Sequence, residues 1–306
     1  MKKFQVIDSC RISDSKDLVN ILNLGQQPLA NSLKKEIDEI EQKFPLSISF
    51  CNKSSLIQLN ETVNKEILFN RYVWVTGTSK TASNFSKMFA NRLINIINPD
   101  KADLIIEIAS NDGTFMKPFL EKGYYNIFGV DPAKNIAKIA NKMDLNTLPE
   151  YWSSELAKSI LKKYGTAKII FARNVIPHVS DLLDVIKGIH TALDDKGVGV
   201  IEFHYSGKIL KELQYDSIYH EHLCYFSIKS ISHLLKSFGL NPFHAEESPI
   251  SGGALVIFFS KLKKEKTDFF INAVEQEKIL KINDVLNWKN FAKQVLNHKK
   301  RTLEII

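Results

Sequence analysis

The stretch Leu104-Ile-Ile-Glu-Ile-Ala-Ser-Asn-Asp-Gly113 decides the fold class of this 306-residue chain. Its first half, Leu104–Ile108, is an apolar, β-branched run of the kind that forms a strand buried on both faces of a sheet. A short polar turn follows and closes on Gly113, and the next segment, Thr114–Lys122, has the composition of a helix. A buried strand, a tight polar turn and a helix predict the first unit of a parallel α/β sheet.

The same alternation of strand and helix continues through the middle of the chain. Short runs rich in β-branched residues alternate with amphipathic segments, at the spacing expected of parallel strands joined by helices. The expected strands are Asn126–Val130, Lys168–Ala172 and Gly197–Glu202, and the expected helices are Ala133–Met143, Ser154–Tyr164, Asp181–Leu193 and Ile228–Phe238. The pattern predicts a doubly wound α/β sheet.

The last two strands indicate which kind of doubly wound sheet this is. Leu240–His244 and Ala254–Phe259 are separated by a short connection that contains Gly252-Gly253. A parallel pair needs a crossover of about a dozen residues or more, so these two strands have to run antiparallel. An antiparallel last strand on a parallel sheet is typical of Rossmann-like methyltransferases and not of dehydrogenases.

We expect three parts along the chain. Residues 1–80 form a small irregular N-terminal module around Cys10 and Cys51, residues 81–260 form a methyltransferase domain, and residues 261–306 form a basic helical extension. The apolar positions of the extension fit one face of a helix. The helices expected outside the alternating units are Thr81–Ile97 and Ile282–Leu303.

Charge and composition exclude several functions. The net charge is +7, but eleven Lys and Arg stand against five Asp and Glu between Lys261 and Arg301, so most of the excess lies in this tail. The catalytic half is nearly neutral, which argues against nucleic acid as a partner. No apolar run approaches the ~20 residues of a membrane span, and three cysteines are too few for a disulfide framework. We expect a cytoplasmic protein that binds neither nucleic acid nor membranes.

The turn Glu107–Gly113 lies where the first strand meets a helix, which is the ligand crevice of such sheets. Asp131 ends the second strand, eighteen positions after Gly113, where a carboxylate can accept both hydroxyls of an adenosine ribose; the alternative is that it only caps the next helix. Asp112 would repel a pyrophosphate, so the turn suits cationic S-adenosylmethionine better than NAD. Trp152 faces the adenine or, equally, belongs to the core. The expected cofactor-binding residues are Glu107, Ala109, Ser110, Asn111, Asp112, Gly113, Asp131, Pro132, Trp152 and Asn174.

The densest group of proton-transferring side chains is Tyr219-His220-Glu221-His222, followed by Tyr225. A neutral imidazole can accept a proton near pH 7, a carboxylate can orient it, and a phenol can donate to a developing oxyanion. A zinc site or a satisfied structural network is the alternative, since alternation along an extended segment would send His220 and His222 to one face. We favour proton transfer. His178, in a loop past a strand end, is a second candidate whose role is equally open between structure and function.

These motifs resemble the sugar C-methyltransferases that act on nucleotide-bound 4-keto deoxysugars. Members of that family have an N-terminal zinc-binding module, a central methyltransferase domain and a further C-terminal domain. The resemblance runs nearly the whole chain, with the motifs in the same order. It rests on Asn23–Gly25, Pro28–Ser32, Phe44–Leu46, Gln58–Leu59, Tyr72–Ser79, Glu107–Gly113, Gly129–Ala133, Asn174–Val179 and Asp216–Phe226.

The resemblance implies that a base removes a proton from the carbon beside a sugar ketone. The enolate then attacks the methyl group of the sulfonium, which leaves S-adenosylhomocysteine. The implied roles are His222 as the base, Glu221 as the residue that orients the site, and Tyr72, His178 and Tyr219 as holders of the enolate and sugar oxygens. Further substrate contacts are expected from His220, Glu202 and Tyr225. The implied partner is a nucleotide-sugar substrate, and a partner subunit or a homo-oligomer is also open.

The chain departs from the family pattern in three ways. Cys10-Arg-Ile-Ser13 and Cys51-Asn-Lys-Ser54 stand where the family has paired Cys-x-x-Cys sequences, so Ser13 and Ser54 replace two ligands and we expect no structural zinc. Ala109 takes the place of a common glycine, and Trp74 that of a tyrosine. The family's C-terminal domain lies beyond the last residue of this chain. Two other functions therefore stay open: an O-methyltransferase acting on a sugar or small-molecule hydroxyl, and a catalytically degenerate binding subunit.

Overall fold

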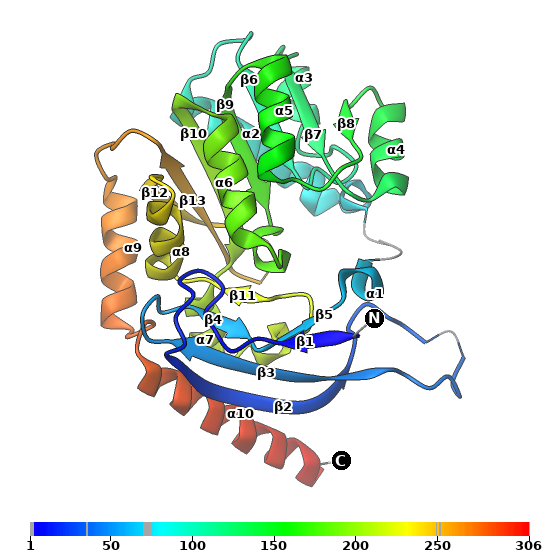
Figure 1. Cartoon of the computed structure of the whole chain (residues 1–306), viewed down its shortest axis with the longest axis vertical. Helices are drawn as coiled ribbons and strands as arrows, with labels where there is room; N and C mark the ends of the chain where they lie inside the picture. Colours follow the sequence, from blue (N-terminus) through cyan, green and yellow to red (C-terminus); the bar gives the residue numbers. More distant parts are fainter. Residues whose placement is uncertain (1–2, 35, 70–74, 249, 251, 306) are drawn as a thin grey trace.

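The computed structural model describes residues 3–34, 36–69, 75–248, 250 and 252–305. Tyr72 and Trp74 therefore lie outside the described residues. Figure 1 shows an upper half built on a large sheet and a lower half built on a second sheet, with one long helix beneath it. None of the helices in the described part of the chain is long and apolar enough to cross a membrane.

The upper half contains a seven-stranded sheet. Its strands are β6 (Leu104–Ile108), β7 (Ile127–Val130), β8 (Thr147–Leu148), β9 (Ala167–Arg173), β10 (Leu193–His204), β12 (Asn241–Ser248) and β13 (Ala254–Ser260). Their order is β12-β13-β10-β9-β6-β7-β8. β13 runs antiparallel to both of its neighbours, whereas the pairs from β10 to β8 are parallel. The predicted doubly wound sheet with an antiparallel last strand is confirmed.

Helices cover both faces of this sheet. They are α2 (Lys80–Ile97), α3 (Lys117–Glu121), α4 (Lys134–Lys142), α5 (Ser154–Tyr164), α6 (Leu182–Ala192), α8 (Ile228–Ser237) and α9 (Asp268–Ile279). The short helix α7 (Ser206–Glu212) lies in the lower half of Figure 1. Ile106 and Ile108 of β6 share one core with α5 and α6, whereas Ile105 belongs to a second core with α2 and α3. Because β6 is buried on both faces, its sequence is apolar except for the buried Glu107.

One predicted boundary was wrong, and two elements were not predicted individually. Helix α3 begins at Lys117, three residues later than expected, because the side chain of Asp112 holds Thr114 in a turn. Strand β8 has only two residues, too few to leave a pattern in the sequence. Helix α9 was not expected, since its apolar residues do not gather on one face and its amphipathic signal is weak.

The N-terminal module is not irregular, which corrects another prediction. It contains a four-stranded sheet of order β11-β4-β3-β2, together with a short β1-β5 pair. The strands are β1 (Phe4–Val6), β2 (Leu18–Pro28), β3 (Lys43–Cys51), β4 (Ile57–Leu59), β5 (Glu61–Val63) and β11 (Cys224–Tyr225), followed by the short helix α1 (Lys65–Phe69). Most of β3 is buried on both faces, and the register of β2 shifts twice, so neither strand shows a clean alternation.

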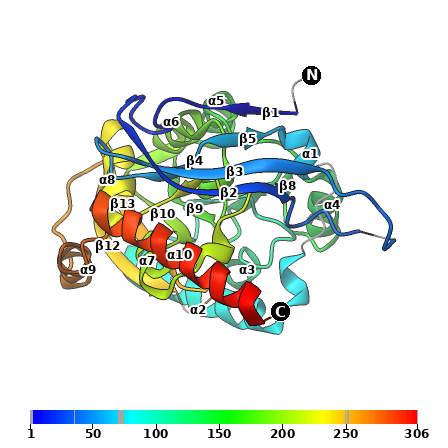
Figure 2. The same ribbon diagram turned by 90° about the horizontal axis from the view of Figure 1, so that it is seen from below.

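Strand β11 comes from the far part of the sequence and joins the two halves. Cys224 and Tyr225 pair antiparallel with Gln58 and Ile57 of β4. The N-terminal sheet is thus completed by a strand that lies well beyond the expected boundary at residue 80, and that boundary stays a prediction. The last helix, α10 (Val285–Ile305), lies across β2 in Figure 2, with Trp288 among its buried side chains.

The two cysteine-serine turns of the N-terminal module meet side by side. Cys10 Sγ lies 3.2 Å from Ser54 Oγ, and Ser13 Oγ lies 3.6 Å from Cys51 Sγ. These separations approach the ~3.8 Å edge of a tetrahedron whose Zn–S bonds measure about 2.3 Å. Burial raises the pKa of the Cys10 thiol, which favours its neutral form. The four residues keep the shape of a zinc site but close it with hydrogen bonds, and two thiols with two hydroxyls do not fit a structural zinc ion.

We expect the double variant Ser13→Cys/Ser54→Cys to bind one zinc ion per chain, because it places four sulfur ligands where two thiols and two hydroxyls now converge. Zinc content is measured by plasma mass spectrometry after expression in zinc-supplemented medium, and the Tm is recorded with and without chelator. The unaltered protein and the two single variants are the controls and should carry no stoichiometric zinc. One tightly held zinc ion in the unaltered protein would contradict this account.

Candidate functional site

The turn between β6 and α3 has a strained backbone. Ala109, Asn111 and Gly113 all have positive φ, at 56°, 50° and 80°. A left-handed conformation costs a residue such as alanine about 1 kcal/mol or more. The Ala109 N–H donates to the carbonyl of Val130 at 2.7 Å, which ties the turn to the neighbouring strand β7. Strain held in place by such bonds is typical of ligand-binding turns.

Asp131 organises this turn from the end of β7. Its Oδ2 accepts from the N–H of Asn111 at 2.8 Å, and its Oδ1 accepts from the N–H of Ala133 at 2.9 Å. Burial raises the pKa of Asp131, and the two N–H donors oppose that rise. The bond to Ala133 closes a turn just before α4, but the N-terminus of α4 has no side-chain cap, so Asp131 does not cap this helix. Each oxygen keeps a second lone pair, and contact with a ribose stays a prediction.

Two polar atoms in this turn are buried without a partner. Among the residues that the structure describes, Glu107 Oε2 and Ser110 Oγ have no hydrogen-bond partner. Burial raises the pKa of Glu107 well above its usual value, Arg173 opposes the rise, and Asp131 and Asp112 add to it. Buried polar groups are nearly always satisfied in the functional state. These two atoms are therefore placed to receive donors from a ligand.

A short segment covers the turn from outside. In η1 (Thr76–Thr78), the Thr76 N–H donates to Asn111 Oδ1 and the Gly77 N–H donates to Asp112 Oδ2, both at 2.9 Å. A Cβ atom on Gly77 would lie 2.5 Å from Asp112 Oδ2, so only glycine permits this approach. The side chains of Asn111 and Asp112 are thus used to hold η1, a task that the sequence alone did not reveal.

Two expected ligand contacts have structural roles instead. Trp152 is buried between α5 and α6, where its Nε1 donates to the carbonyl of Val185 at 3.2 Å, so it is a core residue. Glu202 is fully buried, and its two oxygens accept from Arg173 Nε and from Ser248 Oγ. These bonds give both side chains structural roles, and contact of either with a ligand stays a prediction. Pro132 simply continues the chain from Asp131 into the turn that precedes α4.

The segment Tyr219–His222 forms a turn and not an extended strand, as the His222 N–H donates to the carbonyl of Tyr219 at 3.0 Å. The two histidines consequently do not share a face, which corrects that prediction. His220 is buried, with Nε2 3.3 Å from the carbonyl of Phe44 and 3.2 Å from that of Pro45. It anchors the turn to β3, its Nδ1 is buried without a partner among the described residues, and its contact with a substrate stays a prediction.

His222 is held in one tautomer by its neighbours. Its Nδ1 lies 3.2 Å from the carbonyl oxygen of Ser217, and a carbonyl can only accept, so Nδ1 carries the hydrogen. Nε2 therefore has a lone pair when the ring is neutral, and the hydroxyl of Tyr219 donates to it at 3.0 Å. A neutral imidazole whose lone pair is bonded only to a phenol hydroxyl can act as a general base once that hydroxyl turns to another acceptor.

Other aromatic rings surround this imidazole. The ring centroid of His178 lies 4.6 Å from that of His222, and those of His204 and Tyr225 lie at 6.2 and 6.1 Å. Burial lowers the pKa of His222 well below its usual value, and the charges of His178 and His204 lower it further. Burial also lowers the pKa of His178 to about 4, against hydrogen bonds to the backbone of Glu221 and Asn174. Both rings are thus neutral near pH 7.

Glu221 and Tyr225 frame the cluster. Asn31 Nδ2 donates to Glu221 Oε1 at 2.7 Å, so the N-terminal module fixes this carboxyl group. Burial raises the pKa of Glu221, and the bond from Asn31 opposes the rise. Tyr225 lies on β11 and is fully buried, which raises the pKa of its hydroxyl well above the usual value. Both side chains are close to the base candidate, as the sequence suggested, but Asn31 was missed.

The base candidate and the strained turn meet at one edge of the sheet. Ile108 of β6 lies opposite Ala172 of β9, so the turns that follow these two parallel strands begin at the same edge of the sheet. His178 bonds to the backbone of Asn174 and touches His222. The arrangement joins His222 to the carboxyl edge of the sheet, where ligands bind in such folds.

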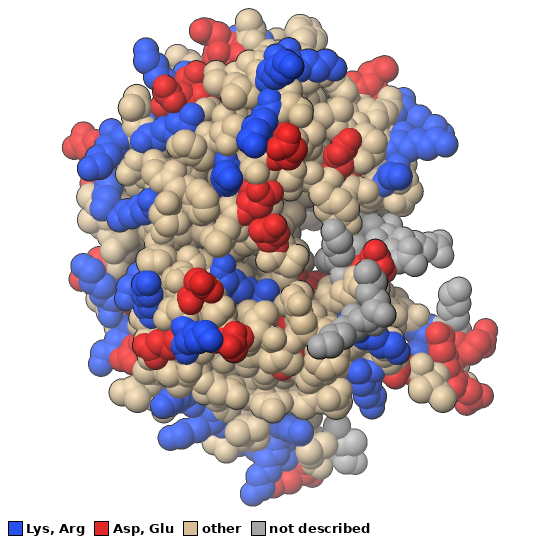
Figure 3. Space-filling model, viewed as in Figure 1, with Lys and Arg blue, Asp and Glu red and all other residues tan. Residues whose placement is uncertain are grey.

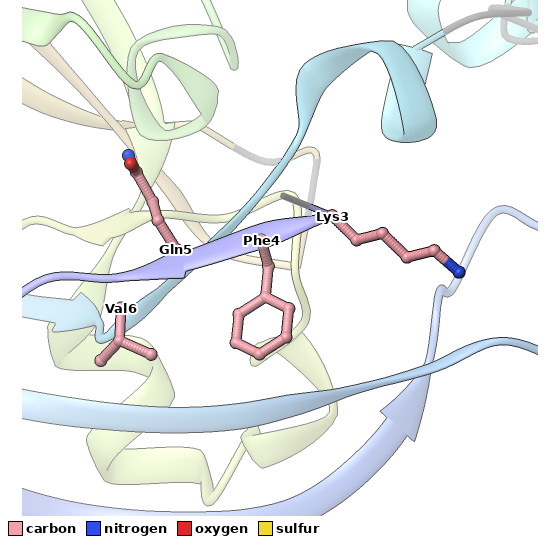
Figure 4. A pocket seen from close by; sticks show the side chains of 4 residues that line it. All are labelled: Lys3, Phe4, Gln5 and Val6. Atoms are coloured by element: carbon pink, nitrogen blue, oxygen red, sulfur yellow. The ribbon is translucent and has the colours of Figure 1, made fainter. Parts of the chain in front are cut away.

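Two hollows on the surface bear on the position of the predicted site. Figure 3 shows a notch between the upper and lower halves of the molecule. A second hollow lies beside β1 and is lined by Lys3, Phe4, Gln5 and Val6, with Gln5 on the opposite side of the strand from Phe4 in Figure 4. One strand with a single cation offers no converging polar groups, so we assign no site there. In the part of the chain that the structure describes, no three His, Cys, Asp or Glu residues are placed to hold a metal ion.

His204, Asn31 and the η1 segment were the residues missed. His204 ends β10 and faces the cluster from the sheet, although its sequence neighbours give no sign of this. Asn31 lies far from residue 221 in the sequence, and only the folded chain brings the two together. One signal for η1 was present, because Tyr72–Ser79 belongs to the motifs that carry the family resemblance.

Comparisons with known proteins show to which family the chain belongs. Residues 10–69 match a family described as "Putative zinc binding domain", and residues 82–245, more than half of the chain, match one described as "Methyltransferase domain". C-methyltransferase NovU of Streptomyces niveus is 30% identical over 254 residues, which are 82% of this chain and 60% of NovU. The chain thus spans about three fifths of the length of that relative.

Two solved structures are similar to the upper half. A SAM-dependent methyltransferase from Anabaena variabilis is 16% identical and covers 58% of this chain and 85% of its own length, with a TM-score of 0.46. Magnesium protoporphyrin IX methyltransferase from Synechocystis, with bound S-adenosylhomocysteine, is 11% identical and covers 59% of this chain and 83% of its own, with a TM-score of 0.45. From the family matches and NovU, this chain belongs to the S-adenosylmethionine-dependent methyltransferases.

We expect Gly113→Ala to weaken binding of S-adenosylhomocysteine by tenfold or more, because its φ of 80° disfavours any side chain and a Cβ would lie 2.6 Å from Leu145. Ala109→Gly is the matched control in the same turn, since it removes a left-handed alanine and should preserve binding. Both are measured by isothermal titration, with Tm recorded alongside. Equal affinities of the two variants would contradict the placement of the cofactor on this turn.

Proposed function

We propose that the protein methylates a carbon atom of a nucleotide-linked keto-deoxysugar through an enolate of the sugar. The observation that carries the proposal is the tautomer of His222, whose Nδ1–H is fixed by Ser217 and whose Nε2 is a neutral base beside Tyr219. The base contacts His178, which bonds to the backbone of Asn174 just after β9, and β9 is the neighbour of β6. Similarity to the C-methyltransferase NovU supports carbon as the acceptor atom.

The turn after β6 fits a cationic cofactor. Glu107, Asp112 and Asp131 are all buried there, and a cation would offset their mutual repulsion. When bound, S-adenosylmethionine supplies an electrophilic methyl group. Glu107 and Ser110 would accept donors of its amino-acid part with their unpartnered oxygens, and Asp131 would accept ribose hydroxyls with its remaining lone pairs.

The side chains of His178, Tyr219 and His222, here called the histidine-tyrosine cluster, would supply the proton chemistry. Nε2 of His222 takes the proton from the carbon next to the ketone, and the imidazolium so formed keeps its Nδ1–H on Ser217. The pair of electrons left on carbon spreads onto the ketone oxygen, which needs a donor. The hydroxyl of Tyr219 is the closest described donor to Nε2. His178, neutral and packed on His222, is the second group placed to hold this oxygen.

Abstraction of a carbon proton is the step that separates this function from its alternatives. An O-methyltransferase would use the same imidazole on a hydroxyl, and a degenerate binding subunit would not move a proton at all. The identity of the sugar and its nucleotide rests on resemblance. A partner subunit or homo-oligomer and a cytoplasmic location stay predictions.

We expect the unaltered enzyme to exchange the α-proton of a nucleotide-linked 4-keto-6-deoxyhexose with deuterated solvent when S-adenosylhomocysteine replaces the methyl donor. His222→Gln should reduce both exchange and methylation at least a hundredfold, as expected for loss of a general base, and leave binding of S-adenosylhomocysteine unchanged. Exchange is followed by proton NMR and methylation by mass spectrometry. Tyr219→Phe is the matched variant, which keeps the base but removes its hydrogen-bond donor, and should lose about tenfold. Methylation without exchange would point to a hydroxyl acceptor.

We expect the activity to persist on the acid side of neutrality. His222 acts in its neutral form, and burial followed by the charges of His178 and His204 lowers its pKa well below 6.5. The base therefore stays unprotonated as the pH falls, and the acid limb of kcat/KM should lie below pH 6.5. In His178→Asn one neighbouring charge is lost, so the limb should move to higher pH. An acid limb above pH 6.5 in the unaltered enzyme would rule out His222 as the titrating base.

A further inference from the structure

His204 faces the histidine-tyrosine cluster without a part in the proposed chemistry. It is the last residue of β10, at the same edge of the sheet as Asn174, whose N–H donates to the carbonyl of Glu202 on that strand. Its side chain is half-buried, and its ring centroid lies 6.2 Å from that of His222 at an interplanar angle of 78°. The ring is therefore edge-on to the proposed base.

The protons of this ring are fixed by Gln214. The amide nitrogen of Gln214 donates to Glu212 Oε2 at 2.7 Å and to the carbonyl of Gly252 at 3.1 Å, and both of these atoms can only accept. The amide oxygen of Gln214 is then the atom that faces His204 Nε2, at 2.9 Å. Because this oxygen accepts, Nε2 of His204 carries the hydrogen and Nδ1 bears the lone pair of the neutral ring.

The lone pair on Nδ1 has no use within the protein. Among the described residues, His204 makes no hydrogen bond other than the one to Gln214, and Nδ1 is not among the buried atoms that lack a partner. The atom is thus open to solvent or to a ligand. His222, in contrast, uses both of its nitrogens. The edge of the sheet therefore presents two acceptor nitrogens, His222 Nε2 and His204 Nδ1, on adjacent rings.

We propose that His204 is a substrate-binding residue whose Nδ1 accepts a hydrogen bond from a hydroxyl group of the acceptor, on a carbon close to the one that His222 deprotonates. The assignment rests on the proposed function and narrows it. It selects a keto sugar that keeps a hydroxyl near the reacting carbon over one that has lost it. A substrate without this hydroxyl would bury Nδ1 without a partner. Because a desolvated polar atom without a partner is costly, the site would disfavour that substrate.

A purely structural role for His204 makes a different prediction. In that case only the bond to Gln214 matters, and it involves Nε2. A glutamine side chain can place a donor near the position of Nε2, whereas an asparagine side chain can place an acceptor near the position of Nδ1. His204→Gln therefore tests loss of the free acceptor, and His204→Asn tests loss of the bond to Gln214.

The experiment compares thymidine diphosphate 4-keto-6-deoxyglucose with its 2-deoxy and 3-deoxy counterparts as methyl acceptors. We expect His204→Gln to lower kcat/KM about tenfold for acceptors that carry the recognised hydroxyl and to leave kcat/KM unchanged for the acceptor that lacks it. His204→Asn should stay closer to the unaltered enzyme on every acceptor. All variants are first checked by Tm and by titration with S-adenosylhomocysteine.

Two results would overturn the assignment. The first is the reverse order, in which His204→Gln behaves like the unaltered enzyme and His204→Asn does not. The second is an equal loss by His204→Gln on all three acceptors, since recognition of a hydroxyl requires that the effects of protein and substrate changes be coupled. If the unaltered enzyme binds S-adenosylhomocysteine but neither exchanges nor methylates any acceptor, the proposed function fails, and the assignment of His204 falls with it.

Discussion

The backbone of Leu223 holds the two halves of this protein in register. Its N–H donates to the carbonyl of Pro177 in η2 (Ile176–His178) at 2.7 Å, and its carbonyl accepts from the N–H of Leu59 on β4 at 3.0 Å. One residue thus bonds to the loop after β9 and to the N-terminal sheet. The turn that carries His222 comes immediately before it, so these two bonds fix where the imidazole lies. Neither half alone could place that ring.

The N-terminal module acts on the site through several contacts of this kind. The carbonyls of Phe44 and Pro45 receive His220, and Asn31 holds the carboxyl group of Glu221. The module in turn depends on the packing of β2, β3 and β4 and on the thiol-hydroxyl pairs of Cys10 with Ser54 and Cys51 with Ser13. Loss of metal ligands is therefore compatible with a rigid module, because the turns that would bind the metal are closed by neutral groups.

The fold of the upper half could be predicted from the sequence because its signals are local. The apolar run of β6, the glycine that closes its turn and the short connection before β13 each act over a few residues. The prediction of a cofactor turn after β6 rests on signals of the same local kind. The roles of Asn31 and His204 and the ion pair of Glu202 with Arg173 could not be predicted. Each depends on contacts between residues far apart in the chain. The alternation rule failed at His220 because a tight turn replaced the assumed strand.

The pairing of Arg173 with Glu202 explains why the edge of the sheet favours a cation over a phosphate. Arg173 follows β9 beside Glu107, and a free guanidinium there would attract a pyrophosphate. Its Nε is instead bonded to Glu202, which Ser248 holds from β12, and its guanidinium lies 3.5 Å from the ring centroid of Phe115. With that charge balanced, Glu107, Asp112 and Asp131 dominate the local potential. On the proposed function, Glu202 would influence the choice of cofactor without touching it, because it balances the charge of Arg173 beside Glu107.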